Sequence, residues 1–105
     1  MERTAVRERI ERLVEQGLGE LTPHLRAWAE SHLITPKRVR LFDSIESPET
    51  FPCWLVTDHK GVNDSSYRVV YDENRNQFGF EVKLADGREL FMGWIGSFAE
   101  TVENL

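Results

Sequence analysis

The sequence predicts an α+β fold, in which an N-terminal helical hairpin packs on an antiparallel sheet of about five strands and a short helix ends the chain. Three observations carry this prediction. Apolar residues repeat at helical spacing through the first third of the chain, residues 67–95 allow one consistent cross-strand register, and Ser97 begins a helix-capping sequence. A length of 105 residues without an internal repeat predicts a single domain over 1–105.

Two helices are expected before the sheet. A stripe of apolar side chains predicts a helix over about residues 2–16, which Gly17 should end by adopting a left-handed conformation. Thr22-Pro23, with a hydroxyl cap and proline at the first position, predicts a second helix over about 23–33. This helix should end before Pro36, because the residue preceding a proline is disfavoured in a helix. The short connection indicates an antiparallel hairpin.

The strands are expected after the second helix. Residues 39–42 form a short candidate strand, and residues 53–58 combine the branched and aromatic types of a buried strand. From Tyr67 onward the pattern predicts a three-strand meander. A four-residue loop at 73–76 and a three-residue loop at 85–87 set charged and apolar side chains opposite suitable partners. A slip of one residue would move every side chain to the wrong face.

One face of this meander is expected to pack under the helices. Its apolar rows are Tyr67-Val82-Leu90, Val69-Phe80-Met92 and Tyr71-Phe78-Trp94. On the opposite face the same register pairs Arg68 with Glu81 and Lys83 with Glu89.

The opposite face of the meander also suggests a docking surface. The register sets Gly79 opposite Gly93, which would leave a furrow bordered by Phe91. Two alternatives stay open, because another element of the chain could cover this face, or the glycines could mark bulges.

The last element predicted is a short helix. Ser97 and Glu100 form a capping box, in which each side chain accepts a hydrogen bond from the backbone of the other residue. Phe98, Val102 and Leu105 follow at helical spacing, so this helix should dock on the core.

The sequence offers candidates for chemistry but no catalytic constellation. Cys53 needs a neighbouring base to act as a nucleophile, and its place in a predicted buried strand favours a role in the core. Asp58, His59 and Asp64 lie in a polar segment that lacks the ligand spacing of a metal site. We therefore assign no catalytic residue, no metal ligand and no cofactor.

The charge is unevenly distributed. The chain has a formal net charge of -5, with +2 in residues 1–40 and -7 in the remainder. This acidic balance argues against nucleic acid as a partner, because binding to phosphates requires a basic surface. A single cysteine, together with the absence of an apolar run approaching the roughly 20 residues that cross a bilayer, predicts a cytoplasmic protein that does not enter a membrane.

These exclusions lead to a non-enzymatic cytoplasmic protein-binding module as the first functional hypothesis. We expect such a protein to act in the manner of a small acidic inhibitor, antitoxin or immunity protein, and its charge favours a basic protein partner. The residues expected at the contact are Asp58, Asp64, Arg68, Asp72, Glu73 and Phe91.

The alternative hypothesis is a small-ligand-binding protein or a minor enzyme. Its pocket would lie between the helical hairpin and the sheet and would be lined by aromatic side chains. These are Trp28, Trp54, Tyr67 and Tyr71, which serve equally well as core residues. The sequence leaves the oligomeric state open.

Overall fold

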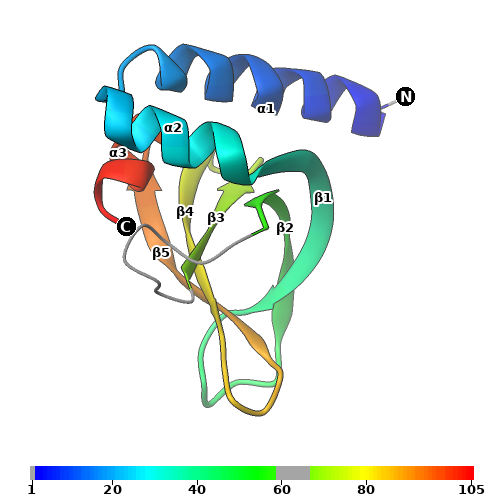
Figure 1. The fold of residues 1–105 in the computed structure, drawn as a ribbon. Coiled ribbons are helices and arrows are strands. Elements are labelled where there is room, and N and C mark those ends of the chain that lie inside the picture. The colour runs from blue at the N-terminus through cyan, green and yellow to red at the C-terminus, as the bar shows by residue number, and fades with distance from the viewer. Residues whose placement is uncertain (1, 59–66) are drawn as a thin grey trace.

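The computed structural model describes residues 2–58 and 67–105, with side chains from Ala5 onward. Helix α1 (Glu2–Leu18) and helix α2 (Pro23–His32) form an antiparallel hairpin over one side of the sheet (Figure 1). A short helix, α3 (Phe98–Glu103), ends the chain close to them. The predicted α+β class and the order of its elements are confirmed.

The five strands form a small closed barrel. They are β1 (Leu33–Phe42), β2 (Thr50–Thr57), β3 (Tyr67–Asp72), β4 (Gln77–Lys83) and β5 (Glu89–Gly96). Consecutive strands pair antiparallel, and β1 meets β5 through a parallel pair between Phe42 and Leu90. This closure gives the sheet an outer face, part of which lies beneath the helices, and an inner face that the barrel encloses.

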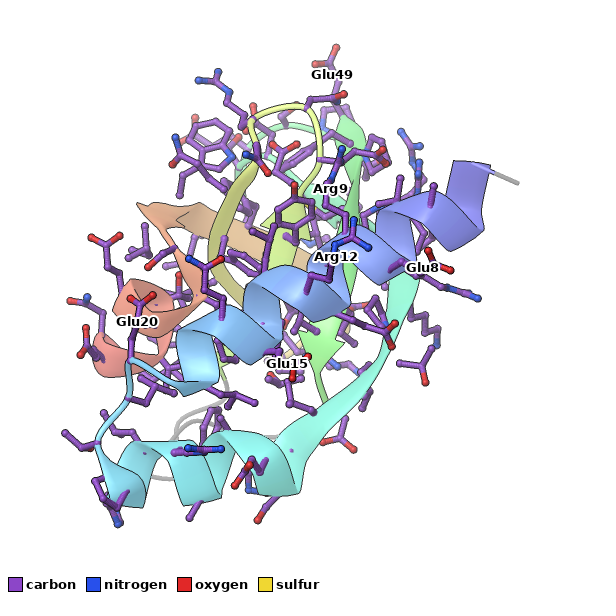
Figure 2. All side chains as sticks on the ribbon, turned by 90° about the horizontal axis from the view of Figure 1, so that it is seen from above. Glu8, Arg9, Arg12, Glu15, Glu20 and Glu49 are labelled. Carbon is purple, nitrogen blue, oxygen red and sulfur yellow. The ribbon has the colours of Figure 1, made fainter. Side chains whose placement is uncertain are left out.

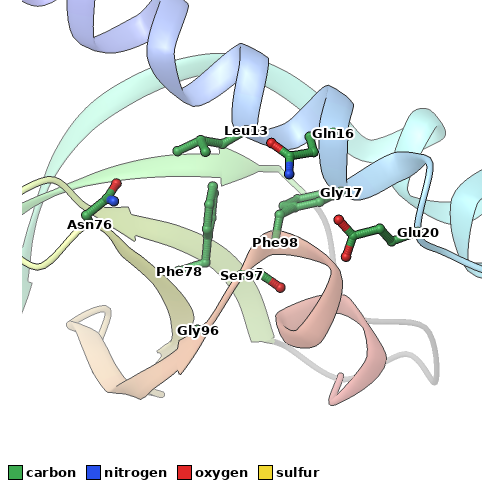
Figure 3. A pocket seen from close by; sticks show the side chains of 9 residues that line it. All are labelled: Leu13, Gln16, Gly17, Glu20, Asn76, Phe78, Gly96, Ser97 and Phe98. Carbon is green, nitrogen blue, oxygen red and sulfur yellow. The ribbon is translucent and has the colours of Figure 1, made fainter.

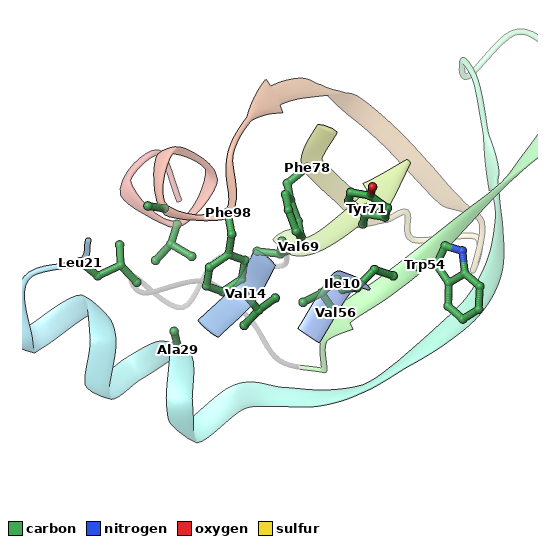
Figure 4. Packing of buried hydrophobic residues seen from close by; sticks show 12 residues of the cluster. Ile10, Val14, Leu21, Ala29, Trp54, Val56, Val69, Tyr71, Phe78 and Phe98 are labelled. Carbon is green, nitrogen blue, oxygen red and sulfur yellow. The ribbon is translucent and has the colours of Figure 1, made fainter. Parts of the chain in front are cut away.

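Hydrophobic clusters occupy both faces. In the cluster between the helices and the sheet, Val14 of α1 and Phe98 of α3 lie near Phe78 of β4 (Figure 4). A second cluster fills the barrel with residues from four strands: Leu41, Cys53, Leu55, Val70 and Phe91. Successive strand residues point to opposite faces, which explains why neighbouring residues of β3 belong to different clusters.

The β3–β4 register is the one that the side-chain pattern predicts. Every predicted pair between described residues is present, including Arg68 opposite Glu81, whereas Ser66, predicted opposite Lys83, lies outside the described residues. The three-residue loop at 85–87 is also confirmed, because Gly87 has the positive φ, 94°, that its last position requires.

The β4–β5 register departs from the prediction after its first pairs. Glu81 lies opposite Phe91 as expected, but Gly79 lies opposite Trp94 and not opposite Gly93. One extra residue of β5 is therefore accommodated in a bulge, so the predicted pairs further along this ladder are wrong.

Two glycines explain this bulge. A Cβ atom on Gly79 would lie 2.1 Å from the carbonyl oxygen of Gly93, and Gly93 itself has a φ of 117°. A second irregularity follows before Gly96, whose φ is 142°. Met92 and Trp94, predicted to lie under the helices, are instead 44% and 40% exposed.

The face predicted to carry a docking furrow is the interior of the barrel. Phe91 and Val70 are buried there, and the two glycines that should form the furrow do not face each other. The furrow prediction is wrong. Both alternatives hold, since the chain itself covers this face and Gly93 lies in a bulge.

The ends of the helices agree only in part with the prediction. Gly17 lies inside α1, where an added Cβ would lie 2.9 Å from Cδ2 of Phe98, so its role is close packing and not termination. The capping box is confirmed, because the backbone N–H groups of Ser97 and Glu100 each donate to the side chain of the other. Thr22 precedes α2 without a side-chain cap hydrogen bond.

Strand β1 is longer than predicted. It begins at Leu33, directly after α2, and therefore includes Pro36 as well as the expected 39–42. Its pairing with β2 is irregular between Leu33 and Lys37, which is where a sheet tolerates a residue without an N–H group.

Candidate functional site

Among the residues predicted to contact a partner, those that the structure describes do not share one surface. Asp58 is exposed just after β2, whereas Asp64 lies outside the described residues. Phe91 is only 8% exposed and belongs to the cluster inside the barrel. Arg68 is partly buried and bound to neighbouring carboxylates, so it contributes mainly to the structure.

Two carboxylates hold the Arg68 guanidinium. Its Nε and Nη2 atoms donate to Glu81 at 2.8 and 2.6 Å, and Nη2 also donates to Glu89 at 2.5 Å. Burial raises the pKa of Glu81, and the hydrogen bond from Arg68 opposes this effect. Glu89 lies opposite Lys83 in the register, as predicted, but its carboxylate contacts Arg68.

Glu73 links the β3–β4 turn to two other strands. One of its oxygens accepts hydrogen bonds from the Trp54 indole at 3.0 Å and from Arg38 at 2.8 Å. The Arg38 guanidinium also lies 5.3 Å from the centroid of the Trp54 ring. Glu73 is therefore already engaged within the fold.

The aromatic residues of the alternative hypothesis line none of the three recesses described below. Trp54 and Tyr71 are buried in the cluster under the helices, and Trp28 packs against its edge. Tyr67 stacks on Phe80 with ring centroids 5.7 Å apart. Their positions correspond to core packing.

A recess on the barrel combines carboxylates with aromatic rings. It has a volume of about 240 Å³ and is lined by Asp43, Glu49, Thr50, Phe51, Asp72 and Trp94. We call it the acidic–aromatic recess. Asp43 follows β1, and Glu49 directly precedes β2, which begins with Thr50 and Phe51. Asp72 ends β3, and Trp94 lies in β5. The closure of the barrel therefore brings together residues that are far apart in the sequence.

The centre of this recess is a hydrogen-bonded pair of Asp72 and Trp94. The indole Nε1–H donates to Oδ2 of Asp72 at 2.9 Å, and the backbone N–H of Asn74 donates to Oδ1 at 3.0 Å. Asp72 is 5% exposed, whereas the Trp94 ring reaches solvent. Phe91 supports this ring from inside the barrel, with centroids 5.1 Å apart, and Phe51 packs edge-on against Phe91.

The other two carboxylates of the recess are exposed. Among the described residues, neither Asp43 nor Glu49 forms a side-chain ion pair. Figure 2 shows the Glu49 side chain projecting outward, well clear of Arg9 and Arg12 on α1. These carboxylates are therefore free to meet a cation from outside.

Two arginines border the same region. The Arg75 guanidinium lies 4.2 Å from the centroid of the Trp94 ring. Arg40 donates to the side-chain and backbone oxygens of Thr50 at 2.9 and 3.0 Å. Two arginines of the protein thus already contact residues of the recess, Arg75 at the Trp94 ring and Arg40 at Thr50.

Sequence reasoning selects Asp72 and misses the other members of the recess. Simple alternation places Trp94 in the row under the helices, because the alternating pattern does not include a bulge. The signal that could have corrected this is the pair of glycines at 93 and 96 in one strand. No pattern in the sequence marks Asp43 and Glu49 as site residues, since they become neighbours of Asp72 only through the barrel topology.

A second recess lies beside α1 (Figure 3). It has a volume of about 250 Å³, with Leu13, Phe78 and Phe98 on its apolar side. Polar groups also border it, namely Gln16, Glu20, Asn76 and Ser97. This mixture of groups suits a small neutral molecule better than a strongly charged one.

A third recess lies on the opposite side of α1, against β1. It has a volume of about 220 Å³ and a mainly apolar lining that includes Ile34, Pro36 and Val56. Glu11 and Glu15 of α1 also line it.

Other kinds of site are not apparent in the described residues. Within 2–58 and 67–105, no group of three or more His, Cys, Asp or Glu side chains is placed to hold a metal ion. No helix in those ranges has both the length and the apolar character needed to span a membrane. Cys53 is 1% exposed, and burial raises the pKa of its thiol to about 12, so it lacks the reactivity of a catalytic cysteine.

Comparisons with protein-family models, curated proteins and solved structures find no match for this chain.

Proposed function

We propose that this chain is a non-enzymatic, cytoplasmic protein that binds a basic protein partner, in the manner of a small acidic inhibitor, antitoxin or immunity protein. One observation carries the proposal. The acidic–aromatic recess places Asp43, Glu49 and Asp72 beside an exposed tryptophan in one cavity of about 240 Å³. Carboxylates and aromatic rings together favour a cationic side chain.

The size and chemistry of the recess support a side chain as its occupant. A water molecule takes up about 30 Å³ in the liquid, so the recess has room for the head group of one lysine or arginine and a few waters. Asp72 makes its hydrogen bonds to neutral donors, so its charge is left for a cation to balance. Asp43 and Glu49 would then contact that cation directly.

The overall charge supports a basic macromolecule as the source of this side chain. A net charge of -5 attracts a basic partner from beyond contact distance and speeds its encounter at low salt. The buried thiol of Cys53, the single cysteine, is compatible with a reducing compartment.

The experiment that tests this proposal compares two equal changes of charge. In isothermal titration with a synthetic peptide of mixed lysine and arginine residues, Asp43→Asn with Glu49→Gln should weaken binding about tenfold, which corresponds to about 1.4 kcal/mol. The matched control, Glu8→Gln with Glu15→Gln on α1, should change the affinity much less. Equal weakening by both pairs would contradict the proposal, because binding would then depend on net charge alone.

A small-ligand function is the second candidate. The recess beside α1 supports it, because polar groups such as Asn76 and Gln16 border an apolar surface there. That recess lies between a helix and the sheet, where the alternative hypothesis expected a pocket, although different residues line it. A ligand in this position would contact α1 and leave the acidic–aromatic recess unchanged, which separates the two functions experimentally.

A further inference from the structure

We infer that the acidic–aromatic recess recognises an arginine side chain of the partner, and that Arg75 of this chain occupies the recognising aromatic ring until the partner displaces it. This inference rests on the proposed function and specifies its ligand. The observation behind it is the contact of 4.2 Å between the Arg75 guanidinium and the Trp94 ring centroid.

The Trp94 ring is held in a fixed orientation. Asp72 accepts its indole N–H at 2.9 Å, and Phe91 contacts the ring from the barrel interior. Trp94 is nevertheless 40% exposed, although both of these neighbours are buried. The glycine-containing bulge of β5 produces this exposure, so the strand presents a rigid aromatic surface at the edge of the recess.

Guanidinium fits this arrangement better than ammonium does. A guanidinium group is planar, so it can stack on the indole and at the same time donate hydrogen bonds within its plane to Asp43 or Glu49. A lysine ammonium is a compact, strongly hydrated charge and cannot make both contacts equally well. The position of Arg75 shows that a guanidinium group can lie over this ring.

Arg75 is weakly held and therefore easy to displace. It lies in the exposed turn between β3 and β4, and it forms no ion pair with the carboxylates that the structure describes. An exposed cation over an aromatic ring is a weak interaction by itself. A partner arginine that also reaches Asp43 and Glu49 would make contacts that are not observed for Arg75.

The experiment titrates the whole protein with two peptides, one alternating arginine and glycine and the other alternating lysine and glycine. The arginine peptide should bind about tenfold more tightly to the unmodified protein, since stacking and paired hydrogen bonds are available only to it. Trp94→Leu should abolish this difference, whereas Trp94→Phe should keep part of it. Thermal unfolding of each variant establishes that it is folded before the affinities are compared.

Arg75→Gln tests the displacement, with Arg26→Gln as the control of equal charge. Arg26 lies on α2, where it pairs with Glu30. Arg75→Gln should raise the affinity for the arginine peptide about threefold, through release of the ring, and raise that for the lysine peptide less. Arg26→Gln should affect both peptides equally.

The outcomes separate this inference from the proposed function. Equal affinity for the two peptides, still reduced by Asp43→Asn with Glu49→Gln, would overturn the arginine inference and leave the proposed function intact. An unchanged affinity in Arg75→Gln would overturn the displacement. Failure of both peptides to bind would overturn the proposed function itself.

Discussion

At the scale of single residues, Cys53 shows how burial determines chemistry. Its thiol lies in the barrel interior with Leu41 and Leu55, and burial is the main cause of its raised pKa, with the negative charge of Asp72 contributing in the same direction. The thiol therefore stays protonated in the folded protein at neutral pH, where it packs as a small apolar group.

This environment predicts a pH dependence of stability. The pKa of Cys53 is about 12 in the folded protein, against an ordinary value of 9.0, so the folded state retains a proton that the unfolded chain loses. The contribution of this pKa difference to the free energy of unfolding is complete below pH 9.0 and is lost as the pH rises toward 12. Relative to Cys53→Ala, the free energy of unfolding should fall by up to about 1.4 kcal/mol per pH unit in that window.

Denaturant titrations of the two proteins at several alkaline pH values provide the measurement. The comparison removes the contribution of tyrosines and lysines, because both proteins contain them. If the two free energies decline in parallel above pH 9.0, the account of this thiol is wrong.

At the scale of elements, the bulged strand β5 is the feature that gives the barrel its exposed tryptophan. Gly79 allows β4 to approach the carbonyl of Gly93, and the positive φ of Gly93 directs the chain through the bulge. Without this irregularity, Trp94 would lie opposite Phe78 under the helices, as simple alternation predicts.

Substitution of Gly79 tests this account of β5. In Gly79→Ala, the new methyl group would meet a backbone carbonyl at 2.1 Å, which cannot move without breaking the bulge. We expect the free energy of unfolding to fall by about 3 kcal/mol or more. In the control, Gly87→Ala, nothing lies within 4 Å and only the φ of 94° is strained, so the loss should be about 1 kcal/mol.

Chemical denaturation measures both losses. A Gly79→Ala protein no less stable than Gly87→Ala would contradict the close approach of the two strands. A loss of the solvent-exposed Trp94 fluorescence in Gly79→Ala would further link the bulge to the recess.

The contrast between the two hairpins shows which elements a sequence can predict. The pairing of β3 with β4 depends on local alternation and a short loop, so matching Arg68 with Glu81 is sufficient to find it. The bulge depends on backbone contacts between Gly79 and Gly93, which side-chain matching does not consider. Barrel closure through Phe42 and Leu90 depends on the bending of all five strands and has no local signal.

At the scale of the whole molecule, the structure shows which acidic residues are paired within the fold and which are exposed. Some acidic residues are engaged within the fold, including Glu81 and Glu89 on Arg68 and Glu73 on Arg38. Asp43 and Glu49 are exposed beside a buried carboxylate and an aromatic ring. The acidic composition suggests a basic partner, and the topology suggests where on the surface that partner would bind.

The site was therefore less predictable from the sequence than the fold. Asp72 could be chosen because it precedes an acidic turn, but its hydrogen bond to Trp94 requires the bulge. Residues 43 and 49 border a loop between two strands, and only the tertiary structure places them next to the end of β3.

The measurement that tests the central claim most directly is an amide and indole NMR titration with the mixed lysine and arginine peptide. The account predicts that the Trp94 indole N–H signal and the amides of residues 43, 49–51 and 72 shift together. The indole N–H signal of Trp54, which donates a hydrogen bond to Glu73, should keep its chemical shift. Shifts confined to Gln16, Asn76 and α3, or spread evenly over the acidic surface, would contradict a partner site in the acidic–aromatic recess.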